Sequence, residues 1–66
     1  MNNLIIARAN NATGLNFKGY KMPIGVEKLR KTKLICNIDG YGKITHSIST
    51  GNYYFVDTLH NKYLLF

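Results

Sequence analysis

Three groups of cationic residues carry the chemistry that is easiest to recognise in this chain. One stretch, residues 28–33, reads K-L-R-K-T-K; a second, residues 17–21, reads F-K-G-Y-K; a third combines Tyr41 with Lys43. Cationic side chains neutralise phosphates, and exposed tyrosine rings stack on unpaired bases. We therefore predict an anion-binding surface made of Lys18, Tyr20, Lys21, Lys28, Arg30, Lys31, Lys33, Tyr41 and Lys43.

The charge of the whole chain points the same way. Nine Lys and Arg face three Asp and Glu, which gives a formal net charge of +6 over 66 residues. Such a charge attracts nucleic acid, acidic proteins or anionic lipid. The simpler interpretation is that it only keeps a small domain soluble, because net charges of about 2–8 are ordinary at this size.

Two histidines offer a second kind of chemistry. Metal-independent ribonucleases can use two histidines as acid and base, and His46 and His60 are the candidates for these roles here, with Lys43 or Lys62 to stabilise the phosphate charge. The competing interpretation is that His46 packs beside its apolar neighbours and that His60 lies in a turn. A pair of histidines is weak evidence without geometry, so we expect a protein that is not an enzyme.

The residue types that bind metals are present but badly spaced. Cys36, His46, Asp57 and His60 match no short zinc pattern, so we expect no metal and no cofactor. Cys36 alternates with Leu34 and Ile38, which predicts a small core residue. A single cysteine forms no internal disulfide, which favours a cytoplasmic location, in the host cytoplasm if the chain is viral.

Turn residues divide the chain into short strands. Asp39-Gly40 predicts a hairpin, because residues 33–38 and 43–49 alternate on either side of it. We expect a second hairpin from residues 53–56 and 62–66, and further strands at 4–7 and 15–22, with 4–6 a neighbour of the last strand. Residues 23–30 read as a loop or a helical turn, since Val26 and Leu29 are three positions apart.

One stretch breaks the alternation. Tyr53, Tyr54, Phe55 and Val56 are all large and apolar or aromatic, which is typical of a strand buried on both faces or of one whose outer face meets a partner. Ile35 is expected to point outward, because its neighbours 34 and 36 should point inward. The candidate protein interface is therefore Ile35, Tyr53, Tyr54 and Val56, which would also serve a homodimer.

These elements predict one mainly β domain over residues 1–66. We expect a small rolled antiparallel sheet or a five-stranded SH3/OB-like barrel, with room for one short helical turn near residues 24–31. The N-terminal residues lack the features of a signal peptide, and no apolar run approaches the ~20 residues of a membrane span.

Two functions follow from the sequence. The first is a non-enzymatic basic module that binds nucleic acid, RNA or single-stranded DNA, with little sequence specificity. The second is a protein-binding inhibitor or adaptor that covers an acidic site on a partner protein or, if the chain is viral, on a host protein. Charge patterns alone do not separate these anionic partners.

Overall fold

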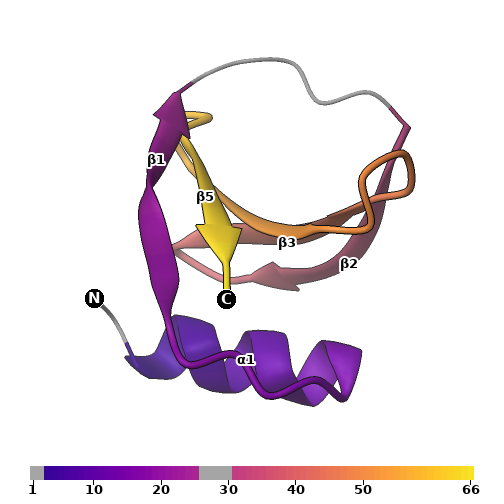
Figure 1. The fold of residues 1–66 in the computed structure, drawn as a ribbon. Helices are drawn as coiled ribbons and strands as arrows, with labels where there is room; N and C mark the ends of the chain where they lie inside the picture. The colour runs from indigo at the N-terminus through magenta and orange to yellow at the C-terminus, as the bar shows by residue number, and fades with distance from the viewer. Residues whose placement is uncertain (1–2, 26–30) are drawn as a thin grey trace.

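The fold is a five-stranded antiparallel sheet with one helix packed against it (Figure 1). The structure is a computed structural model that describes residues 3–25 and 31–66, with side chains for 4–20 and 31–66. The elements are α1 (Asn3–Thr13), β1 (Tyr20–Gly25), β2 (Thr32–Ile38), β3 (Gly42–Ser47), β4 (Tyr53–Asp57) and β5 (Lys62–Leu65). The predicted mainly β, rolled antiparallel sheet is confirmed.

The sheet is open within the described part of the chain. Its strand order is β1-β5-β4-β3-β2, so β1 and β2 are the two edges. In Figure 1, β1 rises steeply beside β5 while β2 and β3 curve beneath, which shows how strongly the sheet is rolled. Of the two predicted forms, the rolled sheet is therefore the one observed, without closure into a barrel.

The hairpin predicted from Asp39-Gly40 joins β2 to β3. Gly40 adopts a positive φ of 80°, and the N–H of Tyr41 donates to the carbonyl of Ile38 at 2.9 Å. The register shifts between Leu34 and Cys36, which marks a β-bulge at Ile35.

The bulge overturns two predicted orientations. Leu34 was expected to point inward but is 52% exposed, and Ile35 was expected to point outward but is half-buried against the core. One extra residue reverses the alternation along a strand, and no turn signal in the sequence announces it. Cys36 packs against the core as predicted.

The predicted strand at residues 4–7 is wrong, because this segment belongs to α1. Ile5 and Ala9 are four residues apart, so they lie on one side of the helix, where both are buried. Three alanines at 7, 9 and 12 favour the helix. The helix ends at Thr13, and the next residue, Gly14, has a φ of 73° and donates its N–H to the carbonyl of Asn10. Among the described residues, no helix has the length and apolar character needed to cross a membrane.

The strand predicted at 15–22 begins later, at Tyr20. Before it, the Asn10 side chain accepts from the N–H of Phe17 at 2.6 Å and donates to its carbonyl at 3.1 Å. These two bonds tie the connection to α1 and accompany burial of the Phe17 ring. The outer neighbour of β5 is β1, with Tyr20 opposite Leu65, and not residues 4–6 as predicted.

The predicted helical turn near 24–31 falls mainly outside the described residues. Residues 24 and 25 belong to β1, and residues 26–30 lie in the part that the structure does not describe.

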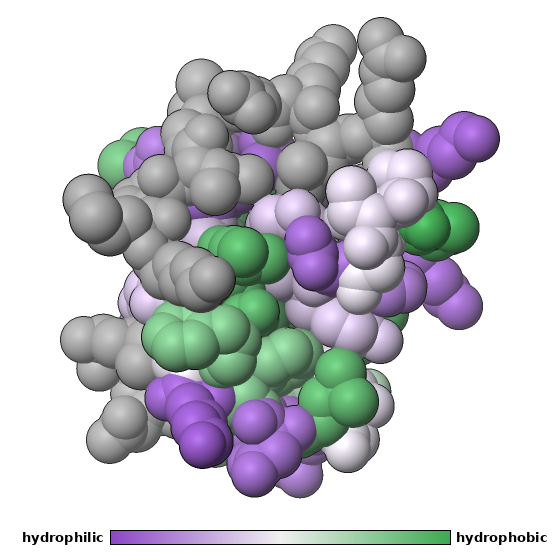
Figure 2. Space-filling view, in the orientation of Figure 1, coloured by the Kyte–Doolittle hydropathy of each residue, from purple (hydrophilic) through white to green (hydrophobic). Residues whose placement is uncertain are grey.

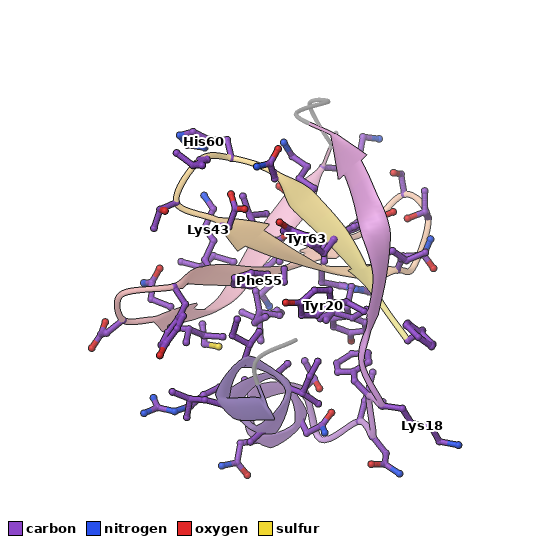
Figure 3. All side chains as sticks on the ribbon, turned by 90° about the vertical axis from the view of Figure 1, so that its left-hand side faces the viewer. Lys18, Tyr20, Lys43, Phe55, His60 and Tyr63 are labelled. Atoms are coloured by element: carbon purple, nitrogen blue, oxygen red, sulfur yellow. The ribbon has the colours of Figure 1, made fainter. Side chains whose placement is uncertain are left out.

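The main core lies between α1 and one face of the sheet, called here the helix face. Its buried members are Ile5, Ala9, Phe17, Ile38, Ile44, Phe55 and Leu65. Tyr20, Phe55 and Tyr63 lie close together in Figure 3. The Phe55 ring centroid is 6.0 Å from that of Tyr20 and 5.7 Å from that of Tyr63, distances at which aromatic pairs attract.

β4 occupies the middle of the sheet and is buried on both faces. Tyr54, Phe55 and Val56 are 6%, 3% and 5% exposed. The absence of alternation in this strand therefore reflects two-sided burial, the first of the two interpretations that the sequence allowed.

Candidate anion-binding site

A row of side chains crosses the sheet on the face opposite the helix face. Val56 of β4 pairs with Lys43 of β3 on one side and with Lys62 of β5 on the other, and Lys43 also pairs with Asn37 of β2. Directly opposed residues of antiparallel strands share a face. Asn37, Lys43, Val56 and Lys62 therefore form one row, called here the lysine row, and the face that carries it is the lysine face.

A cavity of about 240 Å³ opens at the end of this row. Its lining residues are Asn37, Gly42, Lys43, Val56, Asp57, Thr58 and His60. Val56 contributes a buried apolar side chain, whereas Asn37, Lys43, Thr58 and His60 are exposed and polar. Figure 3 shows Lys43 and His60 at the end of the sheet that lies away from α1.

The turn between β4 and β5 shapes one wall of the cavity, and Asp57 organises that turn. Its carboxylate accepts hydrogen bonds from the N–H groups of Leu59 and Asn61, each at 2.9 Å. It also accepts from the Asn61 amide at 3.4 Å and from the Tyr63 hydroxyl at 3.1 Å. His60 completes the turn with a positive φ of 66°, a conformation in which His is enriched.

These contacts set the charge state of Asp57. Burial raises the pKa of its carboxyl, but the hydrogen bonds from Asn61, Tyr63 and Leu59 together outweigh burial, so the pKa lies below its ordinary 3.8. Burial, followed by the hydrogen bond to Asp57 and its negative charge, raises the pKa of Tyr63 above 10.0. Asp57 is therefore ionised at neutral pH, and its oxygens are occupied by the turn.

The lysines of the row are consequently free of carboxylate partners. Among the described residues, neither Asp39 nor Asp57 forms an ion pair with a lysine. The Lys62 ammonium donates at 3.5 Å to the His60 carbonyl, which leaves its charge uncompensated. Lys43 thus lines the cavity and Lys62 lies on the neighbouring strand opposite Val56, while the carboxylate of Asp57 in the cavity wall is held by the hydrogen bonds of its own turn. Two lysines without a carboxylate partner among the described residues attract an external anion.

The predicted anion-binding residues occupy several places. Lys43 lies at the cavity and Tyr41 in the adjacent turn, whereas Lys18 points away near α1 in Figure 3. Lys33 is opposite His46 at the other end of β3, with Lys31 just before β2. Tyr20 packs in the core against Phe55 and Tyr63. Lys21 lies in β1 without a described side chain, and Lys28 and Arg30 are outside the described residues.

The predicted protein interface is largely internal. Tyr54 and Val56 are buried, and Ile35 is half-buried against the core. Tyr53 is half-buried, with its ring stacked on His46 at 4.1 Å and edge-on to Phe17 at 5.5 Å. Among the side chains that the structure describes, the large exposed apolar ones are Leu4, Leu15, Leu34, Tyr41, Ile48, Leu59 and Phe66. Figure 2 shows apolar side chains in the middle of one face of the molecule.

The two histidines are not brought together. His46 pairs with Tyr53 at the start of β4, whereas His60 follows Asp57, which pairs with Gly42 at the opposite end of β3. Four residues of β-strand separate these positions, about 13 Å along the strand. Within the described part of the chain, no three His, Cys, Asp or Glu side chains group to hold a metal ion.

Lys62, Asn37 and Thr58 are members of the site that the anion-binding prediction did not include. The strand register is the signal that identifies Lys62. Once the lengths of both hairpin turns are known, Lys43, Val56 and Lys62 must lie opposite one another on neighbouring strands. Exposed Asn and Thr residues are common in small domains, and nothing in the sequence distinguishes these two.

No protein-family model matches the chain, and neither a curated protein nor a solved structure shows significant similarity to it.

Proposed function

We propose that this chain is a small, non-enzymatic module that binds single-stranded nucleic acid, RNA or DNA, through backbone phosphates and with little sequence specificity. One observation carries the proposal: Lys43 and Lys62 flank Val56 on one face of the sheet, beside a cavity, and neither pairs with a carboxylate of the described residues. Cations placed in this way neutralise phosphates and release their counterions.

Two further observations support nucleic acid as the partner. The net charge of +6 attracts a polyanion over a long range. Tyr41, which is 38% exposed in the turn before Lys43, offers an aromatic ring at the same end of the sheet for an unpaired base.

The alternative, an inhibitor or adaptor that covers an acidic protein site, is less well supported. It was motivated by an exposed aromatic stretch at residues 53–56 and by an outward Ile35. These side chains are buried or half-buried, so that surface is not displayed by the folded chain. The same burial weakens the case for a homodimer through these residues. The unpaired Cys36 favours action in the cytoplasm, the host's if the chain is viral.

The proposal is tested by salt titration of binding. Fluorescence anisotropy of a labelled oligonucleotide of about eight thymidines is measured between about 50 and 200 mM salt. We expect log K to fall linearly with log salt, with a slope of about −0.7 per phosphate contacted, so roughly −3 to −4 for four to six contacts. Binding that is absent, or that does not change with salt, would exclude the proposal.

A matched pair of variants locates the site. Lys43→Ala/Lys62→Ala removes the two row lysines, and Lys18→Ala/Lys33→Ala removes the same charge elsewhere. We expect the first variant to reduce the magnitude of the slope by about 1.4, the contribution of two phosphates, and the second to change it less. Equal losses in both would show that net charge, and not the lysine row, determines binding.

A further inference from the structure

We infer that the cavity at the lysine row takes one unpaired base of the bound strand, with the phosphates on either side of that base held by Lys43 and Lys62. The base subsite depends on the proposed function and adds to it a contact that backbone binding does not require. It is carried by the size, the apolar wall and the polar rim of the cavity.

The apolar wall favours a base over a phosphate. Val56 lines the cavity at 5% exposure and lies between the two lysines. A phosphate pressed against an isopropyl group loses hydration without gaining a hydrogen bond, which is unfavourable. The flat face of a base is largely apolar, so its contact with the part of Val56 that reaches the cavity is less costly than that of a phosphate.

The size of the cavity fits a single base. Its volume of about 240 Å³ lies below the ~300–1,000 Å³ of sites for drug-sized ligands. A base inside a duplex must be unstacked and unpaired before it reaches such a pocket. The subsite therefore explains a preference for single strands.

The rim supplies both kinds of hydrogen-bonding group. Asn37 offers an amide that donates and accepts, Thr58 a hydroxyl that does both, and His60 an imidazole. Among the residues that the structure describes, these three side chains have no hydrogen-bond partner. Every base presents donors or acceptors on its edge, so a rim of this kind holds any base with little selectivity.

The register places the charges around the base. Lys43 and Lys62 lie one strand to either side of Val56, and neighbouring strands are about 4.8 Å apart. A base resting against Val56 thus has a lysine of a neighbouring strand on each side, and the Lys62 ammonium lies 3.5 Å from the carbonyl of His60, a residue of the cavity wall. The phosphates that flank a nucleotide likewise lie on either side of its base.

The test compares two oligomers of equal charge. One is the eight-thymidine strand; the other is a strand of the same length in which every nucleotide is abasic. We expect the wild-type chain to bind the thymidine strand about tenfold more tightly, as one stacked or enclosed base provides. Equal affinities, each salt-dependent, would overturn the base subsite and leave the proposed function standing. Absence of binding to both would overturn the two together.

Two variants of equal composition then locate the base. Asn37→Ala/Thr58→Ala removes rim groups, whereas Asn11→Ala/Thr32→Ala removes an exposed Asn and an exposed Thr away from the cavity. We expect the first to lower the preference for thymidine over abasic strand to about threefold or less and the second to keep it near tenfold. A preference retained in the first variant, or lost in both, would overturn the subsite.

The last part of the test uses a polyglutamate peptide of the same charge as a competitor of the thymidine strand. We expect it to compete weakly, because it carries no base for the cavity. Competition as strong as that of the thymidine strand would overturn the inference in favour of an acidic protein partner.

Discussion

The helix face and the lysine face are built from the same strands and carry different side chains. In β4, Phe55 joins the core under α1, while its neighbour Val56 lies between two lysines at a cavity. In β3, Ile44 likewise lies on the helix face and is buried, whereas Lys43 lies on the lysine face and is exposed. Because side chains alternate between the two faces of a strand, one short segment contributes both to the core and to the candidate binding site.

The difference shows how a chain of this size accommodates both tasks. A domain of 66 residues has little apolar surface to bury, and its net stability is on the order of 3–5 kcal/mol. Most members of the core cluster lie on the helix face, whereas Lys43 and Lys62 on the lysine face have no carboxylate partner among the described residues. Substitutions of the buried side chains should act on folding, and those of Lys43 and Lys62 on binding.

The largest expected effect is on the helix face. Phe55→Ala removes a buried ring that contacts Tyr20 and Tyr63, and we expect a loss of about 3–5 kcal/mol in unfolding free energy. That loss equals the whole expected stability, so the variant should be largely unfolded by circular dichroism. Tyr41→Ala, at an exposed aromatic, is the control and should remain folded. A cooperative Phe55→Ala transition near that of wild type would contradict the importance of the helix face.

The next effect concerns Gly42, where β3 approaches β4 and the cavity begins. A Cβ at this position would overlap the Val56 carbonyl oxygen, and the φ of 152° is itself unusual for other residues. We expect Gly42→Ala to cost roughly 2–4 kcal/mol, measured by urea denaturation. Gly40→Ala is the control: it has a φ of 80° but open space around it, so about 1–2 kcal/mol is expected. Equal costs would show that the close approach is relaxed easily.

A smaller effect is expected at the turn beside the lysine row. Asp57→Asn keeps one acceptor oxygen but places an NH₂ group toward the Tyr63 hydroxyl or the backbone N–H groups, and we expect a loss of about 1–3 kcal/mol at neutral pH. Because the pKa of Asp57 is lowered by folding, its contribution is present above about pH 4 and lost as pH falls through the folded value. Asp57→Asn should remove this part of the acid dependence in urea denaturation at several pH values.

Two controls sharpen that prediction. Asp39→Asn changes an exposed turn acid and should leave the acid dependence almost intact. Tyr63→Phe is the control at alkaline pH. Folding raises the pKa of Tyr63, so the contribution of this residue to stability is present below pH 10.0 and lost as pH rises through the folded value. Tyr63→Phe should remove this alkaline dependence. An acid dependence that Asp57→Asn leaves unchanged would show that other groups control it.

The smallest effect on folding is expected at the lysine row itself. Lys43→Ala/Lys62→Ala should change the unfolding free energy by no more than about 0.5 kcal/mol, because neither lysine has a carboxylate partner among the described residues. Thermal denaturation of both proteins at low salt checks this. A loss above about 1 kcal/mol would mean that the two lysines also contribute to folding stability.

Local signals account for the elements that sequence could predict. Asp39-Gly40 flanked by alternating residues specifies the β2–β3 hairpin, and Asp57 begins the next turn as expected. Residues 4–7 form a helix and not the predicted strand. A short apolar run is compatible with either element. The contact of Ile5 and Ala9 with the distant Phe55 cluster favours the helix, and such a contact has no local signature.

The sequence by itself determined the antiparallel hairpins and the positive charge, since turn residues and ionisable groups act locally or by simple addition. Tertiary structure decided which charges stand together, because the alignment of Lys43 with Lys62 depends on the register of three strands. It also decided that residues 54–56 are buried on both faces, since β4 became the central strand only when β1 paired with β5. Long-range pairing is a property of the whole sheet, and no short stretch encodes it alone.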